Sequence, residues 1–193
     1  MTNANTGSPP VLVSGEVPPG RMCAPAQVVV GILRVDDRLL LVRRQRDRPN
    51  AWTPPGGVVH AGELVTEALT RQIREKTGLR LAGMPQLAFT VNTATSTGTP
   101  TSMLAMYFDC YPCAGVLNHV HDPGGGIAEA RLATTSEAIG LLAGSSADRA
   151  ETEPVLAYLS GNLRPLWCYR NDEPATPPEH DLADVIATRG ADQ

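Results

Sequence analysis

The amino-acid sequence predicts an α+β fold in which a mixed β-sheet lies between helices. Three observations predict this fold class. Apolar runs rich in β-branched residues recur along the chain, a long run of helix formers follows the second of them, and 42% hydrophobic against 19% charged residues is typical of a protein with a buried core. With 193 residues, the chain is expected to form one domain with loosely organised ends rather than two domains.

The first elements expected are two strands that form a hairpin. Residues Ala26–Leu33 and Arg38–Val42 are apolar runs, and residues 35–37, Val-Asp-Asp, suit a tight turn between them. A charged connection over residues 43–50 follows the hairpin. Residues 52–57, Trp-Thr-Pro-Pro-Gly-Gly, then form a run that neither a helix nor a central strand tolerates, so we expect a shaped loop there.

A helix is expected over Glu63–Thr77. Helix formers dominate this segment, and its apolar residues Leu64, Ala68 and Ile73 fall near one stripe. Gly78 stands where a helix commonly ends, because glycine adopts the left-handed conformation that closes a C-terminus.

The remaining elements are expected to be strands and short helices. Thr135 is expected to cap the helix that follows the last strand. The strands are Gln86–Thr93, Ser102–Tyr111 and Ile127–Leu132, and the helices are Ser136–Leu142 and Thr152–Leu159.

The composition divides the chain into three parts. Residues 1–23 are rich in Pro, Gly, Ser, Thr and Asn without an apolar core, so they predict a flexible leader rather than a secretion signal. Residues 24–170 hold all the expected elements, and residues 171–193 predict a polar tail. No run approaches the roughly 20 apolar residues that a membrane span requires. We therefore expect a cytoplasmic protein that does not bind membranes.

The net charge and the cysteine content limit which molecules the protein is expected to bind. The net charge of −4 and the pI near 5.5 disfavour a protein that grips nucleic acid backbones, so a small-molecule partner is expected. Cys110, Cys113, His119 and His121 can be interpreted as a zinc site, but a buried core cysteine is the favoured interpretation.

A spacing that begins at Gly57 carries a family resemblance. Five residues separate Gly57 from Glu63, seven more separate Glu63 from Arg71, and residues 71–79 then read Arg-Gln-Ile-Arg-Glu-Lys-Thr-Gly-Leu. This resembles the Nudix box, which is Gly, five residues, Glu, seven residues, then Arg-Glu-aliphatic-any-Glu-Glu-any-Gly-aliphatic. Seven of its nine fixed positions match between Gly57 and Leu79. The resemblance implies the Nudix fold and a site that binds a diphosphate and Mg²⁺ or Mn²⁺.

Two of the three carboxylate positions on the box helix are changed. Positions 72, 75 and 76 are three and four residues apart, so their side chains are expected to share one helix face and the floor of one pocket. Three carboxylates there would hold a hard cation, whereas this chain has Gln72, Glu75 and Lys76. The formal charge of the face moves from minus three to zero, so Mg²⁺ or Mn²⁺ can be held only weakly, if at all, with Glu75 as its ligand.

Lys76 has two interpretations. The chain has 15 arginines and a single lysine, and that lysine stands at a former ligand position. It is either an exposed cation that suits the end of a helix, or a group that replaces part of the metal's charge. In the second case Lys76 anchors a phosphate or carboxylate of the substrate, or acts as an acid and base.

The other candidate residues divide by role. Glu129 is a candidate catalytic base outside the box, although a solvated carboxylate at a strand entrance is the favoured interpretation. Glu63 and Arg71 are expected to brace the box loop against the helix. The candidates for substrate binding are Gly56, Gly57, Arg44, Trp52 and His60, with a core position favoured for Trp52 and a solvated loop position for His60.

Three functions remain open from the sequence. The first is a divergent Nudix-type hydrolase that cleaves a diphosphate linkage in a nucleotide or small metabolite with reduced or unusual metal dependence. The second is a repurposed biosynthetic enzyme that uses Lys76, Glu75 and Gln72 without metal, and the third is a phosphometabolite-binding module that no longer turns its ligand over. The family resemblance also implies a possible homodimer, and a phosphorylated small molecule is expected as the substrate in each case.

Overall fold

A computed structural model describes residues 25–45, 50–96, 101–117 and 125–171. The expected leader, and the expected tail apart from residue 171, lie outside the described residues. The strands are β1 (Ala26–Val35), β2 (Arg38–Arg44), β3 (Ala51–Thr53), β4 (Gly56–Val58), β5 (Arg80–Thr95), β6 (Thr101–Ala114), β7 (Ile127–Thr134) and β8 (Leu166–Arg170). The helices are α1 (Val65–Thr77), α2 (Thr135–Ala143) and α3 (Arg149–Leu159).

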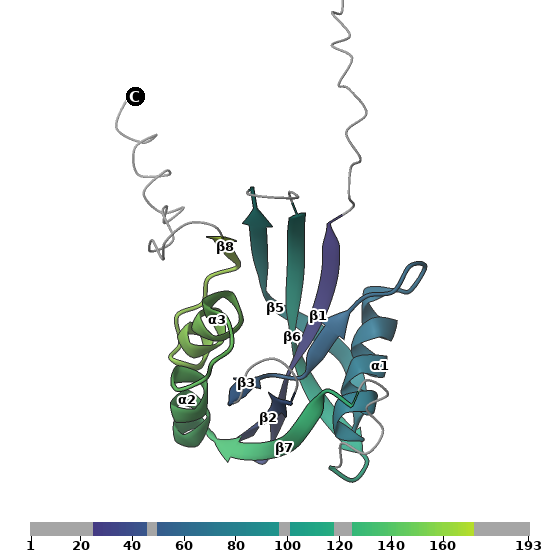
Figure 1. Ribbon diagram of the computed structural model, residues 1–193. Helices are drawn as coiled ribbons and strands as arrows, with labels where there is room; N and C mark the ends of the chain where they lie inside the picture. Colours follow the sequence, from purple (N-terminus) through teal and green to yellow (C-terminus); the bar gives the residue numbers. More distant parts are fainter. Residues whose placement is uncertain (1–24, 46–49, 97–100, 118–124, 172–193) are drawn as a thin grey trace, which may run out of the picture.

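The strands form one mixed sheet, as predicted. Its order is β3-β2-β1-β6-β5-β8, with β4 paired to β1 and β7 paired to β2. Strands β1 and β6 are parallel, with Val30 opposite Tyr107, whereas β5 and β6 are antiparallel. Helix α1 covers one side of this sheet, and α2 and α3 cover the other (Figure 1). The expected α+β sandwich, with a mixed sheet between helices, is therefore confirmed.

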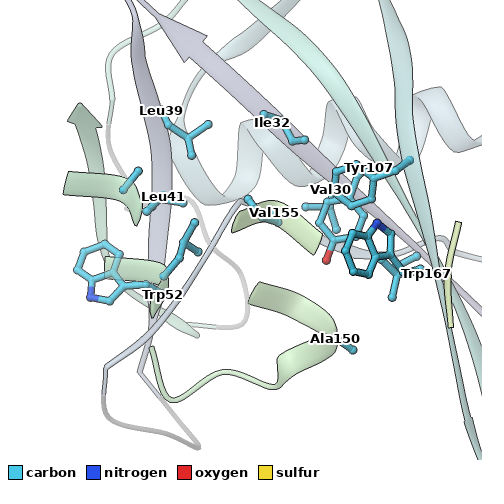
Figure 2. Close-up of a cluster of buried hydrophobic side chains, with 14 of the residues drawn as sticks. Val30, Ile32, Leu39, Leu41, Trp52, Tyr107, Ala150, Val155 and Trp167 are labelled. Atoms are coloured by element: carbon cyan, nitrogen blue, oxygen red, sulfur yellow. The ribbon is translucent and has the colours of Figure 1, made fainter. Parts of the chain in front are cut away.

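Both faces of the sheet are buried because alternate residues of β1 and β2 enter two separate cores. Val30 and Ile32 pack with residues of α2 and α3 in a cluster that Figure 2 shows, where Leu39, Trp52 and Val155 also lie. Val29 and Leu33 pack on the opposite face against Ala68, Leu69 and Ile73 of α1. The period of two along a strand thus explains why these runs are continuously apolar.

Helix α1 begins two residues later than predicted. The backbone N–H of Leu64 donates to Glu67 Oε2 at 2.9 Å, which satisfies one of the free donors at the helix start. Its end is as predicted, because Gly78 has φ of 74° and its N–H donates to the Arg74 carbonyl.

Other strands and helices differ more from their predicted boundaries. The prediction of an irregular loop over residues 52–57 was wrong for both ends of that run, since β3 and β4 pair with β2 and β1 and only Pro54 and Pro55 interrupt them. Strand β8 was not predicted, and α3 begins at Arg149 instead of Thr152. The cap of α2 is Thr134 rather than Thr135, because the Thr134 hydroxyl accepts from the Glu137 N–H at 3.3 Å.

Within the described residues, none of the three helices has the length and apolar character needed to cross a bilayer.

Candidate functional site

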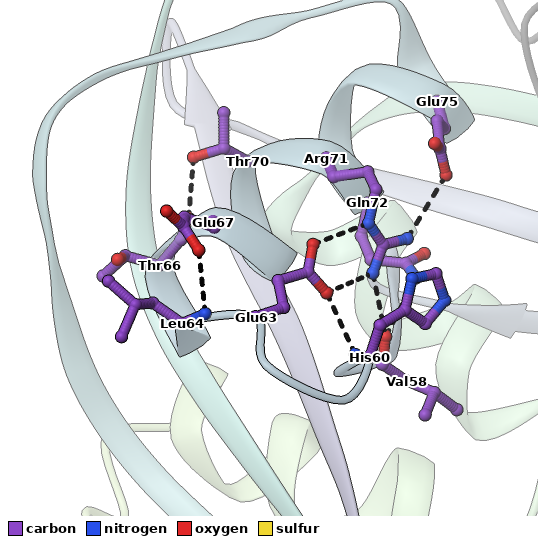
Figure 3. Close-up of polar contacts among 10 residues, drawn as sticks. All are labelled: Val58, His60, Glu63, Leu64, Thr66, Glu67, Thr70, Arg71, Gln72 and Glu75. Carbon is purple, nitrogen blue, oxygen red and sulfur yellow. Dashed lines mark hydrogen bonds and ion pairs between the residues drawn. The ribbon is translucent and has the colours of Figure 1, made fainter.

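A polar network fixes the loop between β4 and α1. The Arg71 guanidinium donates through Nε to Glu63 Oε1 at 2.8 Å and through Nη2 to Glu63 Oε2 at 2.7 Å. Glu63 Oε2 also accepts from the His60 backbone N–H at 3.0 Å, and Arg71 Nη2 donates to the Val58 carbonyl at 3.1 Å (Figure 3). The paired, charge-assisted bonds hold the loop to the helix in one geometry.

This network also shifts the pKa values of Glu63 and Arg71. The hydrogen bonds from Arg71, followed by the backbone N–H of His60, lower the pKa of Glu63 from 4.5 to about 2. The Glu63 carboxylate in turn raises the pKa of Arg71. Glu63 and Arg71, which together brace the loop against α1, are therefore both charged over the whole pH range in which proteins normally work.

We expect Glu63→Gln to remove part of the acid sensitivity of folding. Because the folded-state pKa is depressed, the charged Glu63 contributes stability that is present above about pH 4.5 and is lost as the pH falls toward about 2. The free energy of unfolding should therefore differ most between wild type and variant above pH 4.5, and the difference should shrink below it. Urea unfolding at several pH values measures this, and a difference that does not change with pH would contradict the assignment.

The structure separates the three side chains at positions 72, 75 and 76. Gln72 is buried beneath Gly57, and its Nε2 lies 3.4 Å from the Val58 carbonyl. Glu75 is half-buried and lies 3.5 Å from Arg71 Nη1. Lys76 is half-buried and its Nζ donates to the Gly56 carbonyl.

A cavity of about 260 Å³ is lined by Gly56 and Gly57, whereas Gln72, which lies against Gly57, is not among its lining residues. Lys76 lines this cavity, whereas Gln72 and Glu75 do not. The remaining polar side chains in its wall belong to Arg44, Thr53, Tyr107 and Glu151. Its apolar lining comes from Val28, Val30, Val42, Pro54, Val58, Val91, Met103, Ala105, Ile127 and Ala150, with Gly56 and Gly57 at one edge.

An ion pair closes another part of the cavity wall. Arg44 Nη2 lies 2.6 Å from each oxygen of Glu151, so α3 is held against the end of β2. Because most of the lining is aliphatic, charges in the cavity are expected to interact more strongly than they do in bulk solvent. The arrangement suits a small ligand with one anionic end, which Lys76 would face.

Glu129, Trp52 and His60, which the sequence also indicated as site residues, lie outside this cavity. Glu129 accepts from Arg43 Nη2 at 3.3 Å on the neighbouring strand. Trp52 is 4% exposed and belongs to the core of Figure 2, and its Nε1 donates to Asn50 Oδ1 at 3.1 Å. His60 is exposed and contributes its backbone to the brace. Gly56, Gly57 and Arg44 are the predicted binding residues that do line the cavity.

Sequence reasoning missed Thr53, Tyr107 and Glu151. Tyr107 lies on β6 at an inward-facing position, so its apolar neighbours gave it the pattern of a core residue. Glu151 is 107 positions from its partner Arg44, and no local pattern predicts such a pairing. A search for polar residues at inward positions of strands would have found Tyr107.

The donor set does not fit a multi-carboxylate magnesium or manganese centre. Within the described part of the chain, no three Asp, Glu, His or Cys side chains come together as metal ligands would. Glu75 is the single carboxylate left on the box face and faces Arg71, while an amine takes the third position. The box-face residues that the structure describes therefore offer Mg²⁺ or Mn²⁺ a single carboxylate ligand, Glu75.

The zinc interpretation of the cysteines gains no support. Cys110 is buried against α1, and burial raises the pKa of its thiol to about 12, which disfavours the thiolate that binds zinc. His119 and His121 lie outside the described residues.

Known proteins resemble this chain in sequence and in fold. The NUDIX domain family matches residues 24–155 of the chain. An m7GpppN-mRNA hydrolase of Xenopus laevis is 44% identical over 57 residues, which cover 28% of this chain and 19% of that protein. An ADP-ribose pyrophosphatase of Methanocaldococcus jannaschii is 43% identical over 56 residues, which cover 28% of this chain and 33% of that protein. The matched segments thus span no more than 33% of these two relatives' own length.

Solved structures agree in architecture. The MutT protein of Bacillus halodurans superposes with a TM-score of 0.58 at 20% identity, covering 76% of this chain and 92% of that chain. At this level of identity the likeness concerns the fold alone.

Proposed function

Because the chain belongs to the NUDIX family, we propose that it hydrolyses a diphosphate linkage in a nucleotide or another small metabolite, with a reduced or unusual dependence on divalent metal. The observation that carries the proposal is the position of Lys76. It stands where the box pattern has a carboxylate, and its side chain lines the cavity beside Gly56 and Gly57 of β4. The names of two relatives support the substrate class, because an mRNA cap and ADP-ribose both contain phosphoanhydride links.

Lys76 supplies positive charge in this proposal. A water oxygen attacks one phosphorus, the bridging P–O bond breaks, and the departing phosphate gains negative charge. An ammonium next to that charge in a mostly aliphatic cavity stabilises the transition state more than it would in bulk water. The attacking water gives its proton to the bulk solvent, because Glu75 contacts Arg71 and does not line the cavity.

A panel of phosphoanhydrides tests the proposal directly. The full chain is incubated with a dinucleoside polyphosphate, a nucleoside diphosphate sugar and a short alkyl diphosphate, in Mg²⁺ and in EDTA. Mass spectrometry and phosphate release follow the products. We expect hydrolysis of one class that persists in EDTA, whereas hydrolysis that EDTA abolishes would overturn the proposed metal dependence. Binding without turnover would favour the module that only binds its ligand.

A second candidate is the repurposed enzyme that uses the same amine for an acid–base step without hydrolysis. The observation that favours it is the aliphatic lining around Lys76, since a mostly apolar site suits proton transfer on a carbon skeleton as well. The same mass spectra distinguish the two reactions. Hydrolysis separates the two phosphates of the substrate, whereas an acid–base rearrangement leaves them joined.

We expect Lys76→Glu to raise the affinity for Mg²⁺ or Mn²⁺. The change replaces a repelling ammonium by a carboxylate on the box face, next to the carboxylate of Glu75. A gain of about tenfold or more is expected, since about 1.4 kcal/mol suffices for it. Calorimetric titration of wild type and variant with each metal measures this. Equal affinities would mean that the pocket is closed to metal for a reason other than charge.

A further inference from the structure

Two buried hydroxyls line the cavity. Tyr107 is 3% exposed and Thr53 is 7% exposed, and both contribute to the cavity wall. Among the residues that the structure describes, no group hydrogen-bonds either hydroxyl. Buried polar groups in native proteins nearly always have a partner, so each exception needs an explanation. Two such hydroxyls in one cavity suggest that the partner is a ligand.

The Tyr107 hydroxyl is held in place by the core around it. Its ring stacks on Phe89 with centroids 4.5 Å apart and planes 19° from parallel. Val30 lies opposite Tyr107 across the β1–β6 pair, and Figure 2 shows both side chains on the same face of the sheet. Burial and the nearby Glu151 carboxylate raise the pKa of Tyr107, so its hydroxyl stays protonated and remains a hydrogen-bond donor.

The size and lining of the cavity restrict the kind of ligand that the Tyr107 hydroxyl can hydrogen-bond. A volume of about 260 Å³ lies below the roughly 300–1,000 Å³ of most ligand pockets. Tyr107 is the single aromatic residue among the lining residues, and its ring is already stacked on Phe89. A nucleobase commonly stacks on aromatic side chains, so this lining favours a compact aliphatic group instead.

We propose that Tyr107, together with Thr53, determines substrate specificity by hydrogen-bonding a hydroxyl or carbonyl oxygen on a compact aliphatic part of the substrate. This inference rests on the proposed function, which places the diphosphate of the same molecule at Lys76. The substrate class is then an oxygenated alkyl diphosphate or a similarly small metabolite. Lys76 recognises its charged end, and the two hydroxyls recognise its polar substituent.

One test requires no ligand. Tyr107→Phe keeps the stacked ring and removes a buried hydroxyl without a partner, so it should raise the melting temperature by about 2–4 °C. Tyr158→Phe is the matched control, because the Tyr158 hydroxyl donates to Asp109 Oδ2 at 2.6 Å and its loss should lower the melting temperature. A lower melting temperature for Tyr107→Phe would show that its hydroxyl is satisfied within the protein and would overturn the inference.

The second test uses two defined compounds, n-pentyl diphosphate and 5-hydroxypentyl diphosphate, in calorimetric titrations. Wild type should bind the hydroxylated compound about tenfold more tightly or better. Tyr107→Phe should lose this preference while retaining its affinity for n-pentyl diphosphate, and Thr53→Val should weaken the preference. Tyr111→Phe, an exposed position on the same strand, should keep it. Binding of both compounds without a preference, or binding of neither, overturns the inference. The proposed function fails separately, if the phosphoanhydride panel described above shows no hydrolysis.

Discussion

Replacing Lys76 with methionine is expected to lower the rate of the native reaction by about a hundredfold or more. The side chain lines the cavity where the diphosphate would lie, and no three carboxylates or other ligands gather a metal in the described residues. In the proposed reaction, Lys76 stabilises the charge that develops on the departing phosphate. Methionine keeps most of the side-chain bulk and removes the charge, so the loss would report electrostatics rather than packing.

Arg74→Met is the matched control for this prediction. Arg74 is an exposed cation two residues earlier on the last turn of α1, so it shares the favourable helix-end position but not the cavity. Gln72→Ala should also affect the rate less than Lys76→Met. Steady-state kinetics and thermal unfolding of all three variants separate catalysis from folding. If Lys76→Met folds normally and keeps full activity, Lys76 is a helix-end cation and the proposed role fails.

The elements with a strong local signal were predictable from the sequence. The hairpin of β1 and β2 and the end of α1 at Gly78 follow from apolar periodicity and from glycine's freedom to adopt a positive φ. The pairing of Glu63 with Arg71 also followed from the box resemblance. Strand β8 did not, because a five-residue strand that pairs with β5 is specified by distant contacts rather than by its own pattern.

Spacing along helix α1 predicts which side chains share a helix face, but not which of them line the cavity. Positions 72, 75 and 76 share one face of α1 in sequence terms, yet the neighbours of that face separate them. Gly57 lies against Gln72, and Glu75 contacts Arg71 on the same helix, whereas Lys76 lines the cavity. Which side chain on a helix face enters a cavity depends on the packing of the opposing backbone, and one sequence does not contain that information in local form.

Gly56→Ala is expected to cost about 1–3 kcal/mol of stability and to disturb the cavity wall. Gly56 pairs with Val30 in the β1–β4 ladder. A Cβ at this position would lie 2.8 Å from Val30 Cα and would also overlap the Val29 carbonyl oxygen. These are backbone atoms of the central strand, so the clash can be relieved only by moving β4 away from β1.

The control for this substitution is the same change at Gly140. Gly140 lies within α2, and a Cβ there meets no other atom within 4 Å, so Gly140→Ala should stabilise the helix by about 0.5–1 kcal/mol. Opposite signs in urea unfolding would identify the close approach of β4 to β1 as the cause, since the two variants add the same methyl group. Because Gly56 also provides the carbonyl that Lys76 contacts, Gly56→Ala should weaken binding of the diphosphate as well. A Gly56→Ala protein with wild-type stability and affinity would mean that β4 and β1 can separate at no cost, and that Gly56 does not position Lys76.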